Sequence, residues 1–120
     1  MFDCGICSYA NQIKERVLGV SHETLEALGA VSRETAAQMA AGVRKLAQAD
    51  IGVSTTGIAG PDGGTDEKPV GLVYVGVDSE NYSTVLECRL SRGYRDEREL
   101  IRYLASSHAL RLALTAARKA

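Results

Sequence analysis

The chain has 120 residues, a formal net charge of −1, 45% hydrophobic residues and 24% charged residues. These values are typical of one globular domain, residues 1–120, that is large enough to bury a core. They argue against a basic surface for nucleic acid, and no apolar run approaches the length of a membrane span. Three cysteines, an odd number, fit a reducing compartment better than a disulfide scaffold, so a cytoplasmic location is predicted.

The chain opens abruptly with residues 1–8, MFDCGICS. No polar leader precedes Phe2 and Ile6, so we expect both side chains to belong to a buried segment. This start is the pattern expected of a chain that begins inside a fold.

Three helices are predicted next, over residues 9–18, 22–28 and 33–48. Ser21 and Ser32 are expected to cap the second and third helices, because a serine hydroxyl can accept from the free backbone N–H groups of a first turn. The third helix has apolar residues at helical spacing, which are expected to face the core: Ala36, Met39, Ala40, Val43, Leu46 and Ala47.

Strands and a last helix fill the second half of the chain. The apolar runs 51–56, 72–77 and 82–90 predict strands, the last two paired as a hairpin through the turn residues 78–81. Asp96 and Glu99 form a possible capping box for a helix over 97–117. Its inner side is expected to carry Leu100, Ile101, Leu104, His108, Leu112 and Ala116. Helices and strands in this order predict a layered α/β domain.

A glycine-rich loop joins the first two strands and is the strongest functional signal. Loops this long are usually functional or disordered, and prolines and glycines at fixed turn positions favour a defined shape. Successive backbone N–H groups in such a loop can bind an anion. The alternative is a long, tight connection without a ligand. Its glycines and prolines are Gly57, Gly60, Pro61, Gly63, Gly64, Pro69 and Gly71, and Thr55 and Thr56 precede them.

Three further features each have a functional and a structural interpretation. Lys14 could act as a base if burial lowers its pKa, although a solvated lysine is the commoner case. Arginines cluster before and within the last helix, either as a salt-bridged surface or with one side chain on a ligand. Cys4 and Cys7 form a lone CxxC, which predicts no metal site because zinc as a rule needs four ligands. The arginines are Arg89, Arg92, Arg95, Arg98 and Arg102.

Two segments resemble a known family. Residues 56–64, TGIAGPDGG, followed by 68–71, KPVG, are similar to the signature of the C-terminal domain of the competence/damage-inducible protein CinA, the nicotinamide mononucleotide deamidase family. Tyr9, Asn11 and Lys14 resemble the family's Tyr-Ser-Asn-x-x-Lys, with Ala10 in place of the serine.

The resemblance implies a layered α/β/α domain with a mixed sheet, whose first helix and strand are missing here. It implies hydrolysis of the carboxamide of nicotinamide mononucleotide to nicotinic acid mononucleotide and ammonia, without a cofactor. Lys14 resembles the general base, Tyr9 its helper and Thr56 a positioning hydroxyl. Arg98, or Arg95 because the spacing is ambiguous, resembles a substrate-binding arginine. The other substrate-binding positions implied are Asn11, Thr55, Gly57, Gly60, Asp62, Gly63 and Gly64.

One departure from the family is important. The family's nucleophilic serine lies in a Glu-Ser-Cys-Thr-Gly-Gly stretch, which these 120 residues do not contain. We therefore expect a mononucleotide pocket without amidase activity in this chain alone, unless another chain, Cys4 or Cys7 supplies the nucleophile. The alternative is a non-catalytic nucleotide-binding or assembly module. A sheet that lacks an outer strand has an exposed edge, which predicts a homo-oligomer. No nucleic acid or membrane partner is predicted.

Overall fold

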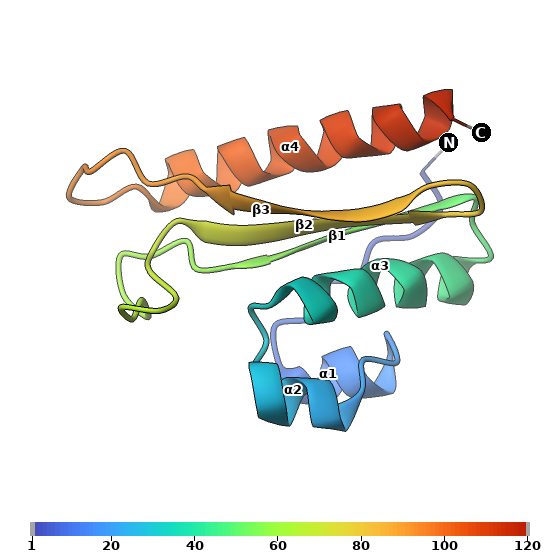
Figure 1. Cartoon of the computed structure of the whole chain (residues 1–120), viewed down its shortest axis with the longest axis horizontal. Helices are drawn as coiled ribbons and strands as arrows, with labels where there is room; N and C mark the ends of the chain where they lie inside the picture. Colours follow the sequence, from blue (N-terminus) through green and yellow to red (C-terminus); the bar gives the residue numbers. More distant parts are fainter. Residues whose placement is uncertain (1, 120) are drawn as a thin grey trace.

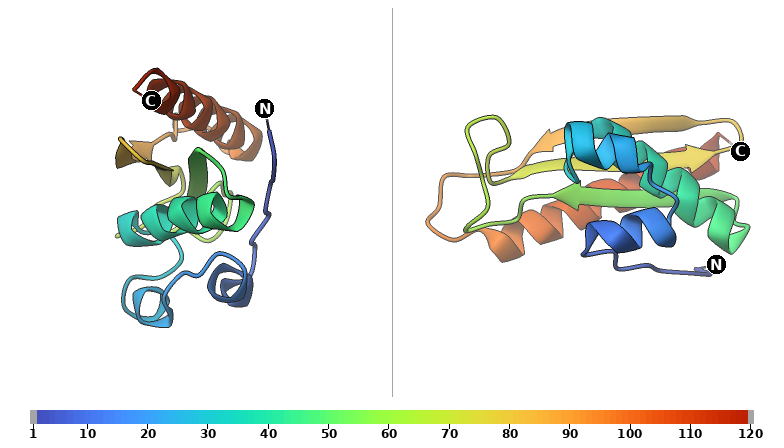
Figure 2. Two further views of the ribbon diagram at one scale, coloured as in Figure 1. Left: turned by 90° about the vertical axis from the view of Figure 1, so that its right-hand side faces the viewer. Right: turned by 90° about the horizontal axis from the view of Figure 1, so that it is seen from below.

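A three-stranded sheet with helices on both faces forms the centre of the molecule (Figure 1). The computed structural model describes residues 2–119. The strands β1 (Ile51–Gly57), β2 (Leu72–Ser79) and β3 (Ser83–Arg89) lie in the order β1-β2-β3. Helix α4 (Arg98–Arg118) covers one face and α3 (Arg33–Ala47) the other, as the two views of Figure 2 also show. The predicted layered α/β/α class is confirmed.

Both strand pairs are antiparallel, whereas the resemblance implied a mixed sheet. Thr56 lies opposite Tyr74 in the first pair, and Val75 lies opposite Leu86 in the second. The hairpin between β2 and β3 is confirmed. Short turns can join only antiparallel neighbours, and the glycine loop reverses the chain between β1 and β2 in the same way.

Two short helices lie beneath α3 and form a further layer (Figure 1). They are α1 (Asn11–Arg16), which is shorter than predicted, and α2 (His22–Leu28). The predicted serine caps are confirmed. Ser21 Oγ accepts from the backbone N–H of Thr24 at 3.2 Å, and Ser32 Oγ accepts from that of Thr35 at 3.0 Å.

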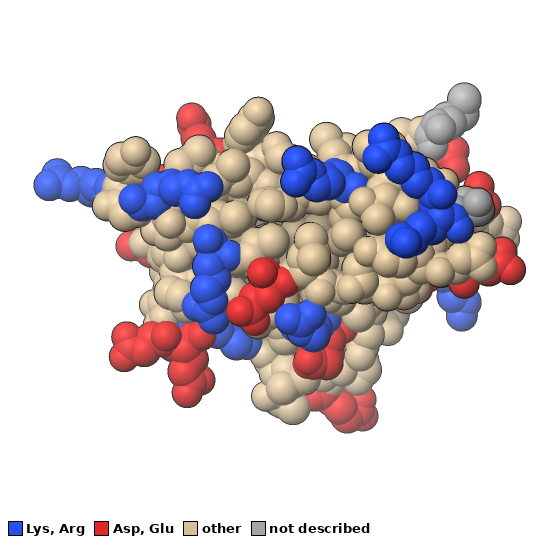
Figure 3. Space-filling view, turned by 45° about the horizontal axis from the view of Figure 1, so that its top comes forward, with Lys and Arg blue, Asp and Glu red and all other residues tan. Residues whose placement is uncertain are grey.

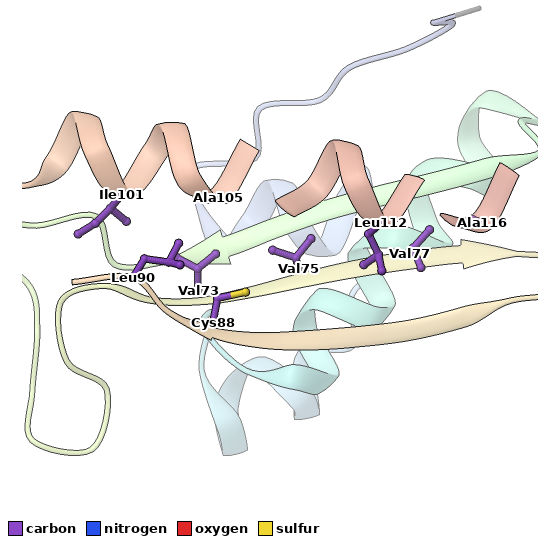
Figure 4. Close-up of a cluster of buried hydrophobic side chains, with 9 residues drawn as sticks. All are labelled: Val73, Val75, Val77, Cys88, Leu90, Ile101, Ala105, Leu112 and Ala116. Atoms are coloured by element: carbon purple, nitrogen blue, oxygen red, sulfur yellow. The ribbon is translucent and has the colours of Figure 1, made fainter. Parts of the chain in front are cut away.

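The sheet buries apolar side chains against both helical layers. Toward α4 the strands contribute valines and Cys88, which pack with Leu90, just after β3, against one stripe of the helix (Figure 4). Beneath α3 a smaller cluster joins the turn after α1 to α2 and α3 through Leu18, Leu25 and Met39. Gly52 lets α3 lie directly on β1, because a Cβ there would be 2.1 Å from the carbonyl oxygen of Ala40.

Three apolar side chains that were expected to be buried are exposed. Phe2 is 85% exposed and Ile6 37%, because residues 2–8 extend beside the sheet without forming a strand. Leu46 is 51% exposed because it lies at the edge of the α3 stripe, as the last residue but one of the helix.

The predicted capping box of the last helix is wrong. The N-cap residue of α4 is Glu97, and its side chain does not cap the helix. Instead Glu97 turns back to accept from Ser91 Oγ at 2.5 Å and from the backbone N–H of Arg92. The carboxylate of Asp96 accepts from the backbone N–H of Arg98 at 3.2 Å.

Candidate functional site

A cleft of about 470 Å³ lies between residues 2–8 and β1. The left view of Figure 2 shows the first residues running past this edge of the sheet. Its polar lining consists of Asp3, Cys4, Cys7, Ser8, Ser54 and Thr55, and its apolar lining includes Leu18, Met39, Val43, Ile51 and Val53. Small-molecule sites combine an apolar lining with a few converging polar groups, and the lining of this cleft contains both kinds.

The cleft lies along an unpaired strand edge. The backbone N–H of Ile58 donates to the carbonyl oxygen of Leu72 at 3.0 Å, so the even-numbered residues of β1 pair with β2. The backbone N–H and C=O groups of Val53 and Thr55 therefore point away from β2, toward the cleft. Among the described residues 2–119, no backbone hydrogen bond links residues 2–8 to β1.

Lys14 is buried beside this cleft. Only 6% of the residue is exposed, and its Nζ donates to the carbonyl oxygen of Ser8 at 2.5 Å. Burial lowers the pKa of Lys14, because an ammonium ion loses solvation there; the Cys7 thiol group acts in the opposite direction. The solvated lysine that residue types alone favoured is therefore wrong, and the neutral amine that a base requires is easier to form.

The two adjacent threonines of β1 point to opposite faces of the sheet, as strand geometry requires. Thr55 is exposed and lines the cleft. Thr56 is buried toward α3, where its Oγ1 donates to the carbonyl oxygen of Ala30 at 2.6 Å. The structure therefore brings Thr55, rather than Thr56, to the hollow that Lys14 and Ser8 border.

The glycine loop has a defined fold of its own. The backbone N–H of Gly71 donates to the carbonyl oxygen of Ile58 at 2.7 Å, which closes the base of the loop. Within it, Thr65 N donates to the carbonyl oxygen of Lys68 at 2.9 Å. Gly60 has φ +78°, and a Cβ there would be 2.6 Å from Val70 Cγ1, so both its conformation and its packing require glycine.

Arg98 joins the last helix to the glycine loop. Its Nη1 donates to the carbonyl oxygen of Gly60 at 2.9 Å. Arg95, the alternative at the sequence level, is exposed in the turn before α4. The contact places the guanidinium of Arg98 beside the loop whose backbone was predicted to hold an anion, and guanidinium groups suit phosphate.

The predicted site residues thus fall into two groups. Thr55 lines the cleft beside β1, and Lys14 is bonded to Ser8, which also lines it. Gly60 and Arg98 instead lie at the glycine loop beyond the carboxyl end of β1. Asp62, Gly63 and Gly64 belong to the same glycine loop and are exposed, and Gly57 ends β1 with its residue exposed. Tyr9 and Asn11, at the start of α1, are exposed and belong to neither group.

Sequence reasoning missed two side chains that shape this region. Glu97 holds the turn before Arg98, and Lys68 Nζ donates to the carbonyl oxygen of Leu28, which ties the glycine loop to the end of α2. Lys68 belongs to the KPVG segment that resembles the family signature, so that segment could have marked it as a candidate site residue. The sequence holds no comparable signal for Glu97, because its partner Ser91 is six residues away in an irregular segment.

Within residues 2–119, no three His, Cys, Asp or Glu side chains are grouped closely enough to hold a metal ion. No helix in the same range has the length and apolar character needed to cross a bilayer.

This layered domain, with a glycine loop after its first strand and a lysine buried beside that strand, is similar to one group of known proteins. A profile of the CinA C-terminal domain matches residues 1–117. A putative competence-damage inducible protein from Thermoanaerobacter pseudethanolicus is 54% identical over 110 residues, which are 92% of this chain and 26% of that protein. The corresponding protein from Acetivibrio thermocellus is 59% identical over 91 residues, 76% of this chain and 22% of the relative.

Solved structures show the same similarity. The crystal structure of the competence/damage inducible protein CihA from Agrobacterium tumefaciens gives a TM-score of 0.84 at 41% identity, over 90% of this chain and 64% of that one. A CinA superfamily protein from Escherichia coli gives 0.76 at 30% identity, over 93% and 60%. The chain belongs to the CinA C-terminal domain family. It spans about a quarter of the length of the first of these curated relatives.

Proposed function

We propose that this chain binds a pyridine mononucleotide and carries part of the site of a nicotinamide-nucleotide amidase, without hydrolysing the amide alone. The reaction of the complete site is nicotinamide mononucleotide plus water giving nicotinic acid mononucleotide plus ammonia. The buried lysine with a lowered pKa, next to a cleft with hydroxyl and thiol groups, is the observation that carries this proposal.

Amide hydrolysis requires an activated nucleophile and donors for the developing oxyanion. Lys14 supplies a base whose neutral form is favoured by burial, and the unpaired N–H groups of Val53 and Thr55 are donors at the cleft. The Glu-Ser-Cys-Thr-Gly-Gly stretch that carries the nucleophile in the resembled family is absent from these 120 residues. Because the base and the N–H donors are present without that serine, we expect this chain to bind the nucleotide but not to hydrolyse its amide.

Phosphate recognition is assigned to the glycine loop and Arg98. Backbone N–H groups of such a loop bind anions, and a charged guanidinium strengthens that interaction through paired N–H donors. The contact between Arg98 and Gly60 holds the two components together.

Calorimetric titration with nicotinamide mononucleotide tests the binding half of the proposal. Arg98→Ala is expected to weaken binding about tenfold, since a charge-assisted bond contributes roughly 1.5–3 kcal/mol. Arg95→Ala, with the same charge change three residues earlier in the exposed segment before α4, is the control and is expected to bind normally. Equal losses in both variants would contradict the assignment.

An ammonia-release assay tests the catalytic half. We expect no turnover above background from the purified chain. Turnover abolished by Lys14→Ala would show that this chain is an active amidase and would overturn that half. If Cys7→Ser abolished the same turnover, the nucleophile would be the thiol.

The second candidate is an assembly module that does not bind a nucleotide. The unpaired edge of β1 favours it, because exposed edges recruit further strands. A chain that self-associates but gives no heat with either mononucleotide would support this candidate over the first.

A further inference from the structure

The side of the molecule that carries α4 shows basic and acidic side chains in separate groups on a mostly uncharged surface (Figure 3). A different arrangement of charge occurs in the layer of α1 and α2, on the other side of the sheet (Figure 1). Within the described residues 2–119, His22 is the one ion-pairing side chain whose carboxylate partners come from two different helices. These partners are Glu15 of α1 and Glu26 of α2.

Each ring nitrogen of His22 faces a different carboxylate. Nδ1 lies 2.6 Å from Glu15 Oε1, and Nε2 lies 3.5 Å from Glu26 Oε1. An ionised carboxylate only accepts hydrogen bonds, whereas a neutral imidazole carries a single N–H and can direct it at only one of the two. The imidazolium ion carries two N–H groups and can direct one at each carboxylate. The geometry therefore fits the protonated ring.

The charges around His22 favour the same form. The hydrogen bond and the charge of Glu15 have the largest effect, and the charges of Glu26 and Glu23 add smaller ones, so the pKa of His22 lies above its ordinary value of about 6.5. Partial desolvation of the ring acts in the opposite direction and is outweighed. Helix α3 contacts this turn through the neutral amide of Gln38. The charged groups that face the imidazole are therefore glutamates of α1 and α2.

We propose that His22 is a proton-dependent clamp between α1 and α2. The protonated ring attracts Glu15 and Glu26 together, whereas loss of the proton from one ring nitrogen sets a lone pair against a carboxylate. The attraction is present below the pKa of His22 and is lost as pH rises through it. Exposed ion pairs contribute little to global stability, so the clamp is expected to change how often α1 opens rather than whether the domain folds.

Helix α1 is the element on which this clamp acts. It has six residues, and its N-cap residue Ala10 makes no side-chain hydrogen bond, so the helix depends on tertiary contacts. The backbone carbonyl oxygen of Glu15 accepts from the N–H of Gly19 at 3.2 Å, in the turn that leads to His22. Lys14 directly precedes Glu15 and is the base in the proposed function. On the basis of that function, proton uptake at His22 steadies the helix that carries the base.

An NMR titration of the two histidines of the whole chain tests the electrostatic part, with His22→Asn identifying the His22 signal. Glu15→Gln is expected to lower the pKa of His22, and Glu26→Gln to lower it by less, because its oxygen lies farther from the ring. Glu80→Gln removes the same charge in the exposed β2–β3 turn and is expected to leave the His22 titration unchanged. A His22 pKa that Glu15→Gln does not alter would overturn the proposal.

Amide hydrogen exchange tests the clamp itself. The N–H groups of Val17 and Gly19 donate to carbonyl oxygens of α1, and their protection factors are expected to be about twofold to fivefold higher with His22 protonated than with it neutral. His22→Asn is expected to abolish this difference, and Glu80→Gln to keep it. Equal protection on both sides of the His22 titration would overturn the clamp. Neither readout involves a nucleotide or turnover, so both would stand if the proposed function failed.

Discussion

Thr56 and Ala30 are joined by a 2.6 Å hydrogen bond from the threonine hydroxyl to the backbone carbonyl oxygen. The bond links the end of β1 to the loop between α2 and α3, twenty-six residues earlier in the chain. The hydroxyl proton of Thr56 is therefore used in a hydrogen bond within the fold. Any role of Thr56 toward a substrate would use the lone pairs of its oxygen, and that role stays a prediction.

Removing this hydroxyl should cost stability. Thr56→Val keeps the shape of the side chain but leaves the Ala30 carbonyl without its donor, so we expect unfolding free energy to fall by about 1–3 kcal/mol. Chemical denaturation measures this difference. Thr55→Val, on the exposed side of the same strand, should change it by less than about 0.5 kcal/mol. Equal losses would mean that the Ala30 bond contributes nothing specific.

Arg98 should hold the glycine loop as well as a ligand. Arg98→Ala removes the bond to the Gly60 carbonyl oxygen and should lower the free energy of unfolding by roughly 1 kcal/mol in the absence of ligand. Limited proteolysis should then cut residues 61–67 faster than in the parent chain. Unchanged cleavage in Arg98→Ala would mean that Lys68 and the Gly71 bond hold the loop without the arginine.

The buried Lys14 should make stability depend on pH. Its folded-state pKa lies below the unfolded value of about 10.4, so the unfolded chain binds more protons between the two values. Stability from this group therefore rises with pH across that window, and the cost of burying the charge is fully present below it. The unfolding free energy of the parent chain minus that of Lys14→Met should increase as the pH rises toward the unfolded pKa of about 10.4.

An exposed lysine provides the control for this measurement. Lys45 lies in the last turn of α3 and is exposed, so Lys45→Met should run parallel to the parent chain across the same pH range. If Lys14→Met also ran parallel, the amine would be solvated and its role as a base would lose its physical support.

Glu97 should make the stability of the fold depend on pH in the acid range. The hydrogen bond from Ser91, together with the Arg92 backbone N–H, lowers the pKa of its carboxyl below the ordinary value of about 4.3. Its contribution is present above that value and is lost as pH falls through the folded-state pKa. Glu97→Gln should thus lower the Tm at pH 7, with the difference shrinking in acid. Glu80→Gln, in the exposed β2–β3 turn, should leave the Tm unchanged at both pH values.

Local patterns in the sequence were sufficient to predict the elements and some of their boundaries. The predicted helix over 22–28 matches α2, and the serine caps at Ser21 and Ser32 form as expected. Both features depend on neighbours within one helical turn. The capping box at Asp96 failed because Glu97 prefers a contact with Ser91 that no short-range pattern describes.

The candidate site was harder to predict because it depends on tertiary contacts. Residue type alone favours a solvated Lys14, and only the packing of α1 beneath α3, with the Ser8 carbonyl as acceptor, buries it. The same applies to the threonines: alternation along β1 shows that they face opposite sides, but not which side holds the cleft. The contact of Arg98 with Gly60 joins residues thirty-eight positions apart and lies outside any local signal.

Because one side of β1 is unpaired, the backbone amides of this strand should differ in how fast they exchange hydrogen for deuterium. The backbone amides of Val53 and Thr55 have no strand partner, whereas those of Ser54 and Thr56 are donated to β2. Exchange should therefore alternate residue by residue along one strand, fast and slow, while central β2 exchanges slowly on both sides. A chain, ligand or strand that docks against this edge would erase the alternation, so the exchange pattern would report occupancy directly.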